Sequence, residues 1–583
     1  MFKVLKCNKR NYLTVLITSI LLMIVFVLSL NWGEGTKITR KILSVGVIVF
    51  CVIVIPMLAV VLKPFNNGIN KFFQWLGRIK EYSRINSKCV VIRTIVFILI
   101  FPIGLLGGKV VSPNPYVGYT ICTILLILYS IYLYKRISGD RPEGLFACVA
   151  IILGVFMITV TPATPGIMLD DESHYMRVIR FSNEFDGSYY KAEEAVLSGF
   201  TDVIFNKKTY DKESRENYYA SLNDLYETKE QVGAGVPTTI GIYSIAYIPS
   251  AIGIIIAKGL HLSFIHTFMA GKLFNLLFYV LLMYFAIKKL KYGKILFATL
   301  GLIPSNIFMA SCYAYDSWVF GFVALAFAYF ISMLQSDEII ATKDIILMNV
   351  FFFLAFMPKA VYVVMMFPLL FMPKRKFKDK RQRALYYLAA VITVLLLLAS
   401  FVLPFLTAGT GEDLRGGTDV SAFGQLSFVF SNMGYFLKVL FGFLKSFVSF
   451  ANSQKVFQLY AYLGDGKFYI LTLVTLFVVA FLDRKPTKHH NTAVRIGGII
   501  GAALGIIIVA FTFYLAFTPV GANTINGCQP RYILPVLIPF MYFIVPDGIV
   551  TLNKKTVLVN TAVLIMSMTF IYNIYNLSVK LYM

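Results

Sequence analysis

The sequence predicts an all-α polytopic integral membrane protein with about 13–15 transmembrane helices. Apolar runs of about 17–24 residues recur along the 583-residue chain, and about 20 residues cross the hydrocarbon core of a bilayer as a helix. The composition agrees, because 58% of the residues are hydrophobic and only 14% are charged. A soluble chain of this length would carry about a quarter charged residues.

The charge balance is strongly basic, with 54 Lys and Arg against 29 Asp and Glu and a formal net charge of +25. The basic residues cluster between apolar runs, as in "KRKFKDKRQR" (Lys374 to Arg383). Lys and Arg gather in the cytoplasmic loops of membrane proteins and set their orientation. The charge therefore indicates membrane topology, and we expect no nucleic-acid partner. None of the seven cysteines is in a C-x-x-C spacing, so no zinc or disulfide framework is expected.

The first part of the chain, residues 1–143, is predicted to be an N-terminal extension of four spans. Its basic start, "MFKVLKCNKR", places the N-terminus on the cytoplasmic side. The four apolar runs cover residues 12–30, 42–62, 90–106 and 116–134.

The remainder, residues 144–583, is predicted to be the second transmembrane domain. A fifth span, 144–162, leads to an outer loop, 163–262, which contains a polar stretch and the apolar segment 241–262. Counting 241–262 as a span would put the basic "KKLKYGK" (Lys288 to Lys294) outside. We therefore expect 241–262 either to lie along the outer interface or to dip into the membrane and return to the same side.

Eight later apolar runs are predicted to be spans. The run 345–372 is too long for one span and contains Pro358, which stops a helix, so we expect two short spans that meet on the outer side. Residues 423–450 are predicted to be a second interfacial segment. The later spans are 264–287, 294–312, 317–335, 384–404, 468–482, 494–516, 532–546 and 556–577.

The densest charge cluster directly follows the fifth span. It lies in "MLDDESHYMRVIRF" (Met168 to Phe181), where Asp170, Asp171 and Glu172 stand side by side, followed by His174 and Arg177. An acidic pair after a span is often a plain solvated boundary, and the histidine can simply hydrogen-bond the loop. The motif alone does not decide whether these residues form a functional site or only a solvated boundary of the membrane span.

Three further segments place polar residues at the same predicted outer boundary. Asp316 in "SCYAYDS" can cap a helix, and Arg531 in "NGCQPRY" can anchor the interface. Lys359 is more informative, because ionisable groups within membrane segments are costly and tend to be functional. The convergence of four distant segments at one depth favours a functional site. These segments also contain the candidate residues Tyr362, Gln529 and Tyr532.

These residue types suit transfer of a group from a phosphate-linked lipid to a hydroxyl. A carboxylate can accept the proton of the attacking alcohol or hold a divalent cation that activates it. Arg and Lys can neutralise a phosphate leaving group.

Five segments resemble, in order, those of a bacterial membrane family, the domain-of-unknown-function 2142 family, grouped with the GT-C superfamily of polyprenyl-phosphate-sugar glycosyltransferases. The resemblance covers roughly residues 145–580. The segments are "DDESHYMR", "YSIAYIPSAIGIIIAKGLHLS", "LIPSNIFMASCYAYDS", "PKAVYVVMMFPLLFMPKRKF" and "GCQPRYILPVLIPF".

The resemblance implies a GT-C-like fold with outer juxtamembrane helices and an acidic motif in the first long outer loop. Asp316 matches the superfamily's second acidic position. The family's Gln-x-Arg-Tyr pattern matches the segment that begins at Gln529, with Pro530 where a glycine is expected. The Asp-Glu pair of the family pattern can be matched to Asp170 and Asp171, or to Asp171 and Glu172.

We therefore expect an integral-membrane, GT-C-type glycosyltransferase of the bacterial cytoplasmic membrane, with its active site facing outside. It would transfer a sugar from a polyprenyl-phosphate donor to a glycan or cell-wall polymer acceptor. The alternative is a lipid-linked glycan transporter, or a polymerase or assembly protein without transferase activity. The expected catalytic residues are Asp170, Asp171 and Glu172; the expected substrate-binding residues are His174, Arg177, Asp316, Lys359, Tyr362, Gln529, Arg531 and Tyr532; and Asp171 and Asp316 are candidate ligands of a divalent cation (Mg or Mn).

This topology makes a prediction for single cysteines introduced into the loop 163–235. A membrane-impermeant thiol reagent added to intact cells should label them, because the loop is expected on the outer side. Labelling that requires permeabilised membranes would contradict the predicted orientation.

Overall fold

The structure is a computed structural model. It describes residues 93–112, 114–137, 141–183, 189–204, 212–233, 236, 242–408, 419–458, 460, 464, 466–483, 491–546 and 555–582. The predicted spans 12–30 and 42–62, together with the connecting residues 63–89, lie outside the described residues.

The described part of the chain is predominantly helical and contains no β-strand beyond an isolated bridge between Tyr190 and Gln231, which confirms the all-α fold class. Among the described residues, eight helices are long and apolar enough to cross a membrane: Arg93–Val111, Pro115–Tyr134, Pro142–Val160, Phe264–Lys289, Asp316–Gln335, Lys380–Ser400, Thr492–Ala516 and Lys555–Ser578. The elements in order are α4 (Pro115–Ile137), α5 (Pro142–Val160), α6 (Asp171–Asn183), α7 (Lys191–Ile204), α8 (Lys212–Glu227), η2 (Ile242–Tyr247), α9 (Ile248–Gly259), α10 (Phe264–Lys289), α11 (Lys294–Gly301), α12 (Pro304–Ala310), α13 (Asp316–Gln335), α14 (Thr342–Phe356), η3 (Ala360–Phe371), η4 (Lys374–Lys376), α15 (Lys380–Ala408), α16 (Ala422–Ser431), α17 (Met433–Phe447), α18 (Ser453–Phe457), α19 (Tyr469–Leu482), α20 (Thr492–Ala516), η7 (Pro530–Val536), α21 (Leu537–Ile544) and α22 (Lys555–Tyr582).

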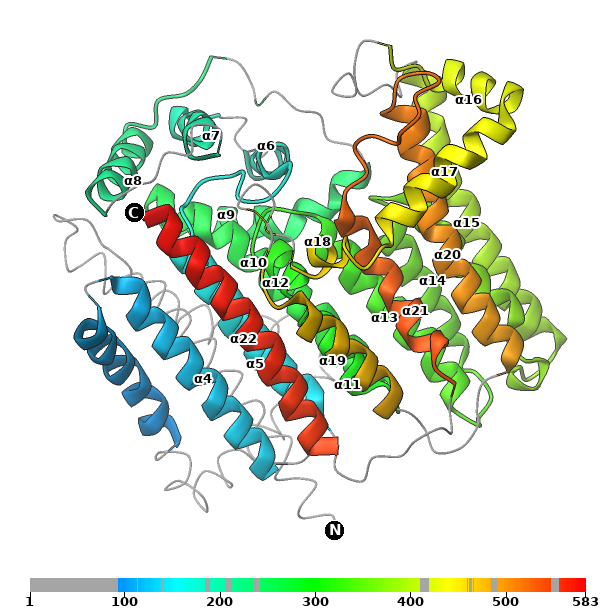
Figure 1. The fold of residues 1–583 in the computed structure, drawn as a ribbon, viewed down its shortest axis with the longest axis horizontal. Helices are drawn as coiled ribbons and strands as arrows, with labels where there is room; N and C mark the ends of the chain where they lie inside the picture. The colour runs from blue at the N-terminus through cyan, green and yellow to red at the C-terminus, as the bar shows by residue number, and fades with distance from the viewer. Residues whose placement is uncertain are drawn as a thin grey trace, which may run out of the picture.

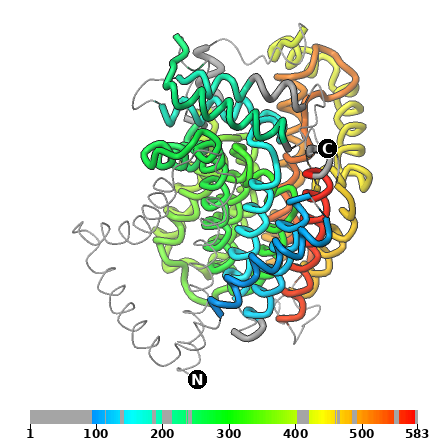
Figure 2. The backbone as a smooth tube through the Cα atoms, turned by 90° about the vertical axis from the view of Figure 1, so that its left-hand side faces the viewer, coloured from blue at the N-terminus to red at the C-terminus, as the bar shows by residue number. Residues whose placement is uncertain are grey.

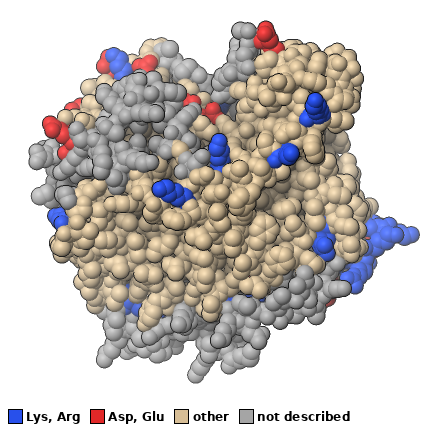
Figure 3. Space-filling model, viewed as in Figure 1, with Lys and Arg blue, Asp and Glu red and all other residues tan. Residues whose placement is uncertain are grey.

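The long helices form one bundle, and the helices α6 to α9 gather at one end of it (Figures 1 and 2). We call this the motif end, because α6 begins in the acidic motif. The opposite end carries the basic residues that end α10 and form η4, and we call it the basic end. Acidic side chains appear near the top of the face in Figure 3, above a broad belt with few charged side chains, all of them Lys or Arg. Such a belt is expected of a bundle that lies in a bilayer.

The centre of the bundle is α5, whose 19 residues are all buried. It packs against α4, α10 and α22, as well as the short helices α11 and α12. Membrane proteins hold such contacts by close packing and hydrogen bonds, since lipid is as apolar as the helices themselves. The helix α5 is therefore held in place by its neighbours on all sides, and the chain continues from its end into the acidic motif.

The predicted span 294–312 is corrected by the structure, because it consists of two helices, α11 and α12. Pro304 begins α12, and Ile303 before it has extended backbone angles (φ −51°, ψ 128°). Proline disfavours helical conformation in the residue before it, which explains the break. At the other end of α11, the Asp483 Oδ2 accepts the N–H groups of Ile295 at 2.6 Å and Leu296 at 3.0 Å.

The break predicted at Pro358 is confirmed. The helix α14 ends at Phe356, and η3 begins at Ala360 after Lys359. Glycines at four-residue spacing on α20 lie against η3, with Gly501 close to the backbone of Val364. Small residues let two membrane helices approach closely, so this contact fixes the segment that carries Lys359.

The apolar segment 241–262 forms η2 and α9, which are too short to cross a bilayer as a helix. The helix α9 packs along the first half of α10, where Gly253 lies against the Ala270 carbonyl and Phe274. Lys258 at its end pairs with Glu193 of α7 at 2.9 Å. These contacts hold α7 and α9 to the bundle.

The segment 423–450, predicted to be interfacial, contains α16 and α17, which are bent by 109° relative to each other. On α17, Phe436 and Phe447 are buried, whereas Leu437 and Phe441 are exposed. An apolar face left exposed in this way is expected of a helix that contacts lipid.

Two adjacent glycines test how closely the helix Arg93–Val111 packs on α4. A Cβ atom at Gly108 would lie 2.3 Å from the Gly118 Cα, whereas a Cβ at Gly107 would meet nothing within 4 Å. We expect Gly108→Ala to lower stability by about 1–3 kcal/mol through overpacking. Gly107→Ala should leave the melting temperature unchanged or raise it, because alanine favours helix. Equal melting temperatures for the two variants in detergent would contradict this packing.

Candidate active site

The acidic motif turns sharply at Asp170, whose φ of 63° lies in the left-handed region. The residue stands immediately before α6, and its carbonyl oxygen accepts the N–H of His174 at 3.0 Å. Few residues other than glycine adopt this conformation, although aspartate tolerates it better than most. Such strained residues persist where the surroundings hold them, and they cluster at functional sites.

The side chain that holds Asp170 is Arg531 of η7, which is 3% exposed. Its NH2 group lies 2.8 Å from the Asp170 Oδ2, and its NH1 group donates to the Leu169 carbonyl at 3.1 Å. Gln529 donates to the same Asp170 oxygen at 3.3 Å. A guanidinium offers several donors in a fixed plane, so it can bind a carboxylate and a neighbouring carbonyl together.

The network continues through Asp316, the first residue of α13. Its Oδ2 lies 3.5 Å from the Arg531 NH1, and its Oδ1 lies 2.8 Å from the Lys359 Nζ. The Lys359 ammonium also lies 4.0 Å from the ring centroid of Tyr532 and 4.9 Å from that of Tyr315, within the range of cation–π attraction. The order Asp170, Arg531, Asp316, Lys359 alternates in sign, and its formal charges cancel. We call these four residues the charge network.

Asp171, which directly follows Asp170, is fully buried. Its Oδ1 accepts the N–H of Tyr313 at 2.8 Å, which joins the start of α6 to the connection between α12 and α13. Burial raises the pKa of the Asp171 carboxyl, and the nearby Lys272 cation opposes this effect. Lys272 of α10 is itself buried, 4.8 Å from the ring centroid of Phe268. Asp171 is therefore placed to position α6, whereas Asp170, with 27% of its side chain exposed, is reachable.

His174 and Arg177 lie on one face of α6, and both contact Tyr247 of η2. The His174 Nδ1 is 2.8 Å from the Tyr247 hydroxyl, and its ring meets Tyr315 edge-on at 5.1 Å. Burial, with the Arg531 cation nearby, lowers the pKa of His174 well below its ordinary value, so its imidazole is neutral near pH 7.

Arg177 is partly exposed. Its NH1 donates to the Ser173 carbonyl at 3.1 Å, and its side chain also hydrogen-bonds Tyr247. In the part of the chain that the structure describes, no carboxylate forms an ion pair with it. Its positive charge is thus available beside the neutral charge network.

The two predicted tyrosines have different surroundings. Tyr362 is fully buried and donates its hydroxyl to the Tyr532 carbonyl at 2.8 Å, so it fixes η7 against η3. Tyr532 stacks on Phe513 at 5.1 Å and presents its ring to Lys359. Tyr362 is therefore a support of the site, whereas Tyr532 contacts the charge network directly.

The structure brings together most of the residues predicted from sequence. Asp170, Asp316, Lys359, Gln529 and Arg531 make direct contacts, and His174, Arg177 and Tyr532 border them. Asp171 and Tyr362 point into the protein, and Glu172 is partly exposed on the first turn of α6.

Three residues were missed from the sequence: Tyr247, Tyr315 and Lys272. Tyr315 directly precedes Asp316, and Lys272 is an ionisable residue within an apolar run, which is itself a signal of function. Tyr247 carries no comparable signal, because tyrosine is common near membrane interfaces.

The divalent cation predicted at Asp171 and Asp316 has a poor donor set in this arrangement. Asp171 accepts a backbone N–H, and Asp316 is paired with two cations. Among the described residues, no group of three His, Cys, Asp or Glu is placed to hold a metal ion. We therefore derive no step through a metal, and the metal site stays a prediction.

The chain matches the family described as predicted membrane protein (DUF2142) over residues 151–540. The match covers about two thirds of the chain and includes every residue of the charge network, so the chain belongs to this family. Neither the curated proteins nor the solved structures contain a match.

Two lysines with similar local contacts test whether the charge network is buried. Lys359 pairs with Asp316 at 2.8 Å and lies over Tyr532, whereas Lys289 pairs with Asp344 at 2.9 Å and lies over Tyr329. We expect Lys359→Met to lower stability by about 3–5 kcal/mol, because it leaves a buried carboxylate short of a partner. Lys289→Met should cost about 1 kcal/mol or less, since its pair is more exposed. Thermal unfolding in detergent measures both, and equal effects would show that the network is solvated.

Proposed function

We propose that this protein is a GT-C-type glycosyltransferase that transfers a sugar from a polyprenyl-phosphate donor to a hydroxyl of a glycan or cell-wall polymer. The observation that carries the proposal is the charge network, which gathers two carboxylates and two cations from four distant segments at one end of a membrane bundle. This arrangement suits a lipid-linked donor, since the tail of such a donor lies in the bilayer while its phosphate and sugar meet polar groups.

Asp170 is the residue best suited to accept the proton of the acceptor hydroxyl. Its carboxylate is partly exposed and fixed by Arg531 and Gln529, whereas Asp171 is buried against Tyr313. Preorganised groups contribute most to catalysis, because they need not reorient during the reaction. The distinction favours matching Asp170 and Asp171, rather than Asp171 and Glu172, to the acidic pair of the family pattern.

The transfer proceeds as one displacement in this proposal. The acceptor oxygen forms a bond to the anomeric carbon of the donor sugar, and its proton passes to the Asp170 carboxylate. The bond between the anomeric carbon and the phosphate oxygen breaks, and the polyprenyl phosphate leaves with the electron pair. Attack from the face opposite the phosphate inverts the anomeric centre.

The leaving phosphate needs a positive charge that the network does not already neutralise. Arg177 fits this role, because it borders the network and forms no ion pair among the described residues. A guanidinium binds phosphate oxygens through two parallel hydrogen bonds. Arg531 and Lys359 would then add donors at the edge of the phosphate while holding the two carboxylates in place.

The orientation in the membrane is part of the same proposal. The motif end would face the outer side of the bacterial cytoplasmic membrane, because the basic end carries the Lys and Arg that mark the cytoplasmic side. The alternative function, a lipid-linked glycan transporter, would place its ionisable residues along a path near the middle of the membrane. The charge network lies at the ends of helices instead, which supports a transferase.

Single substitutions of the three adjacent acids test the proposal. We expect Asp170→Asn to reduce sugar transfer from a polyprenyl-phosphate donor by about 10²–10⁴-fold, the usual contribution of a general base. Glu172→Gln is the matched control on the first turn of α6 and should retain most of the activity. Transfer is measured with purified protein in liposomes, and folding is checked by thermal unfolding.

Asp171→Asn separates a positioning role from a chemical one. Asparagine can still accept the Tyr313 N–H, so this variant should keep more transfer activity than Asp170→Asn. Wild-type transfer by Asp170→Asn would refute the assignment of the base, and wild-type transfer by all three variants would refute the catalytic site.

A further inference from the structure

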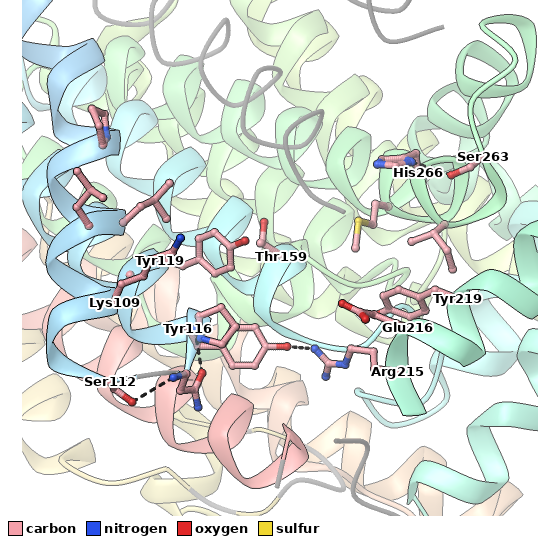
Figure 4. Close-up of a pocket in the computed structure, with 18 of the residues that line it drawn as sticks. Lys109, Ser112, Tyr116, Tyr119, Thr159, Arg215, Glu216, Tyr219, Ser263 and His266 are labelled. Atoms are coloured by element: carbon pink, nitrogen blue, oxygen red, sulfur yellow. Dashed lines mark hydrogen bonds between the residues drawn. The ribbon is translucent and has the colours of Figure 1, made fainter. Parts of the chain in front are cut away.

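A cavity of about 810 Å³ lies at the motif end, apart from the charge network (Figure 4). It is an open pocket lined by the helix Arg93–Val111, α4, α8 and the start of α10, with Thr159 of α5 between them. None of its lining residues belongs to the candidate active site. The lining residues are Pro102, Leu105, Leu106, Lys109, Ser112, Asn114, Pro115, Tyr116, Gly118, Tyr119, Thr159, Arg215, Glu216, Tyr219, Asn223, Ser263, Ile265, His266 and Met269.

The walls of the cavity are amphiphilic. Leu105 and Leu106 come from a helix whose outward face is apolar and exposed, and Ile265 and Met269 of α10 add further apolar surface. The opposite wall is α8, which supplies charged and amide side chains. An apolar wall facing a polar one is suited to a molecule that has both a hydrocarbon chain and a polar head.

The central polar group is Arg215, which is 7% exposed. Its NH1 donates to the Tyr116 hydroxyl, and its guanidinium carbon lies 5.6 Å from the centroid of that ring. Figure 4 shows the two side chains pointing toward each other from α8 and α4, with Lys109 on the neighbouring helix. Lys109 and Arg215 against Glu216 give the lining a formal charge of +1.

The polar wall is fixed in place by hydrogen bonds to the rest of the protein. The Tyr219 hydroxyl accepts the N–H of Ala163 at 2.9 Å, and the Asn223 Oδ1 accepts the N–H of Ile265 at 3.2 Å. The helix α8 is thus joined both to the segment that leads to the acidic motif and to α10. A site held by such contacts is largely preformed, as ligand sites usually are.

We propose that this cavity binds the phosphate head group of an anionic amphiphile, with Arg215 and Lys109 as the phosphate ligands. The hydrocarbon chain would leave along Leu105 and Leu106 toward the lipid. The ligand is a phosphate-bearing lipid, either a membrane phospholipid or a polyprenyl phosphate. The helix Arg93–Val111 and α4 line one side of the cavity and precede residues 151–540, the region matched to the family. The site therefore depends on the N-terminal extension. It does not rest on the proposed transferase activity.

Native mass spectrometry of the purified full-length protein tests the proposal. The protein is titrated with phosphatidylglycerol, a polyprenyl monophosphate and neutral phosphatidylcholine, and the lipid adducts give dissociation constants. We expect at least one phosphate lipid with a free negative charge to bind about tenfold more tightly than phosphatidylcholine, because an arginine binds a phosphate through charge-assisted hydrogen bonds. The tighter of the two anionic lipids identifies the source of the ligand.

Variants assign the binding to the cavity. Arg215→Gln should weaken binding of the anionic lipid about tenfold, and Lys109→Gln should weaken it by a few-fold. Because Lys109 is exposed, its substitution should not disturb folding. Lys191→Gln, on α7 at the same end, is the control for loss of one exposed cation. Asp170→Asn should leave this binding unchanged whatever it does to sugar transfer. The proposal would be overturned if the anionic lipid bound Lys109→Gln, Arg215→Gln and the control variant with equal affinity. It would also be overturned if phosphatidylcholine bound the protein as tightly as both anionic lipids do.

Discussion

The arrangement of the motif end depends on one buried guanidinium. Arg531 contacts the Asp170 and Asp316 carboxylates and the Leu169 carbonyl, so a single side chain joins η7 to the start of α6 and the start of α13. Removing a charge from water is costly, and the cost is offset only where opposite charges and hydrogen-bond partners surround it. The position of each partner is thereby constrained by the need to satisfy the same buried cation.

This constraint explains two features that would otherwise be unfavourable. Asp170 keeps a left-handed backbone conformation, which the contacts of Arg531 to its side chain and to the preceding carbonyl stabilise. Lys359 stands at a helix break within an apolar segment, where Asp316 and two tyrosine rings surround its ammonium. The helix break at Pro358 places Lys359 between α14 and η3, and Asp316 of the charge network is its ion-pair partner. The charge network is formally neutral, and among the described residues no carboxylate forms an ion pair with Arg177 beside it.

Much of this site could be predicted from sequence, because each polar group flanks an apolar run and the alternation of spans places those flanks at one end. The roles of Asp170 and Asp171 could not be separated, because they depend on where α6 begins and on which carboxylate meets the Tyr313 N–H. The division of 294–312 into α11 and α12 was missed, although Pro304 marks it. The cavity at Arg215 was not predicted either, since it exists only where the N-terminal helices pack against α8.

The central claim is that the charge network and Arg177 surround the reacting end of a lipid-phosphate sugar. The most direct test is a structure of the full-length protein in lipid nanodiscs with a phosphonate analogue of a polyprenyl-phosphate sugar. We expect the phosphonate oxygens within hydrogen-bond distance of Arg177, with the anomeric carbon facing Asp170. Density for the analogue elsewhere, with the charge network unchanged and Arg177 uncontacted, would contradict it.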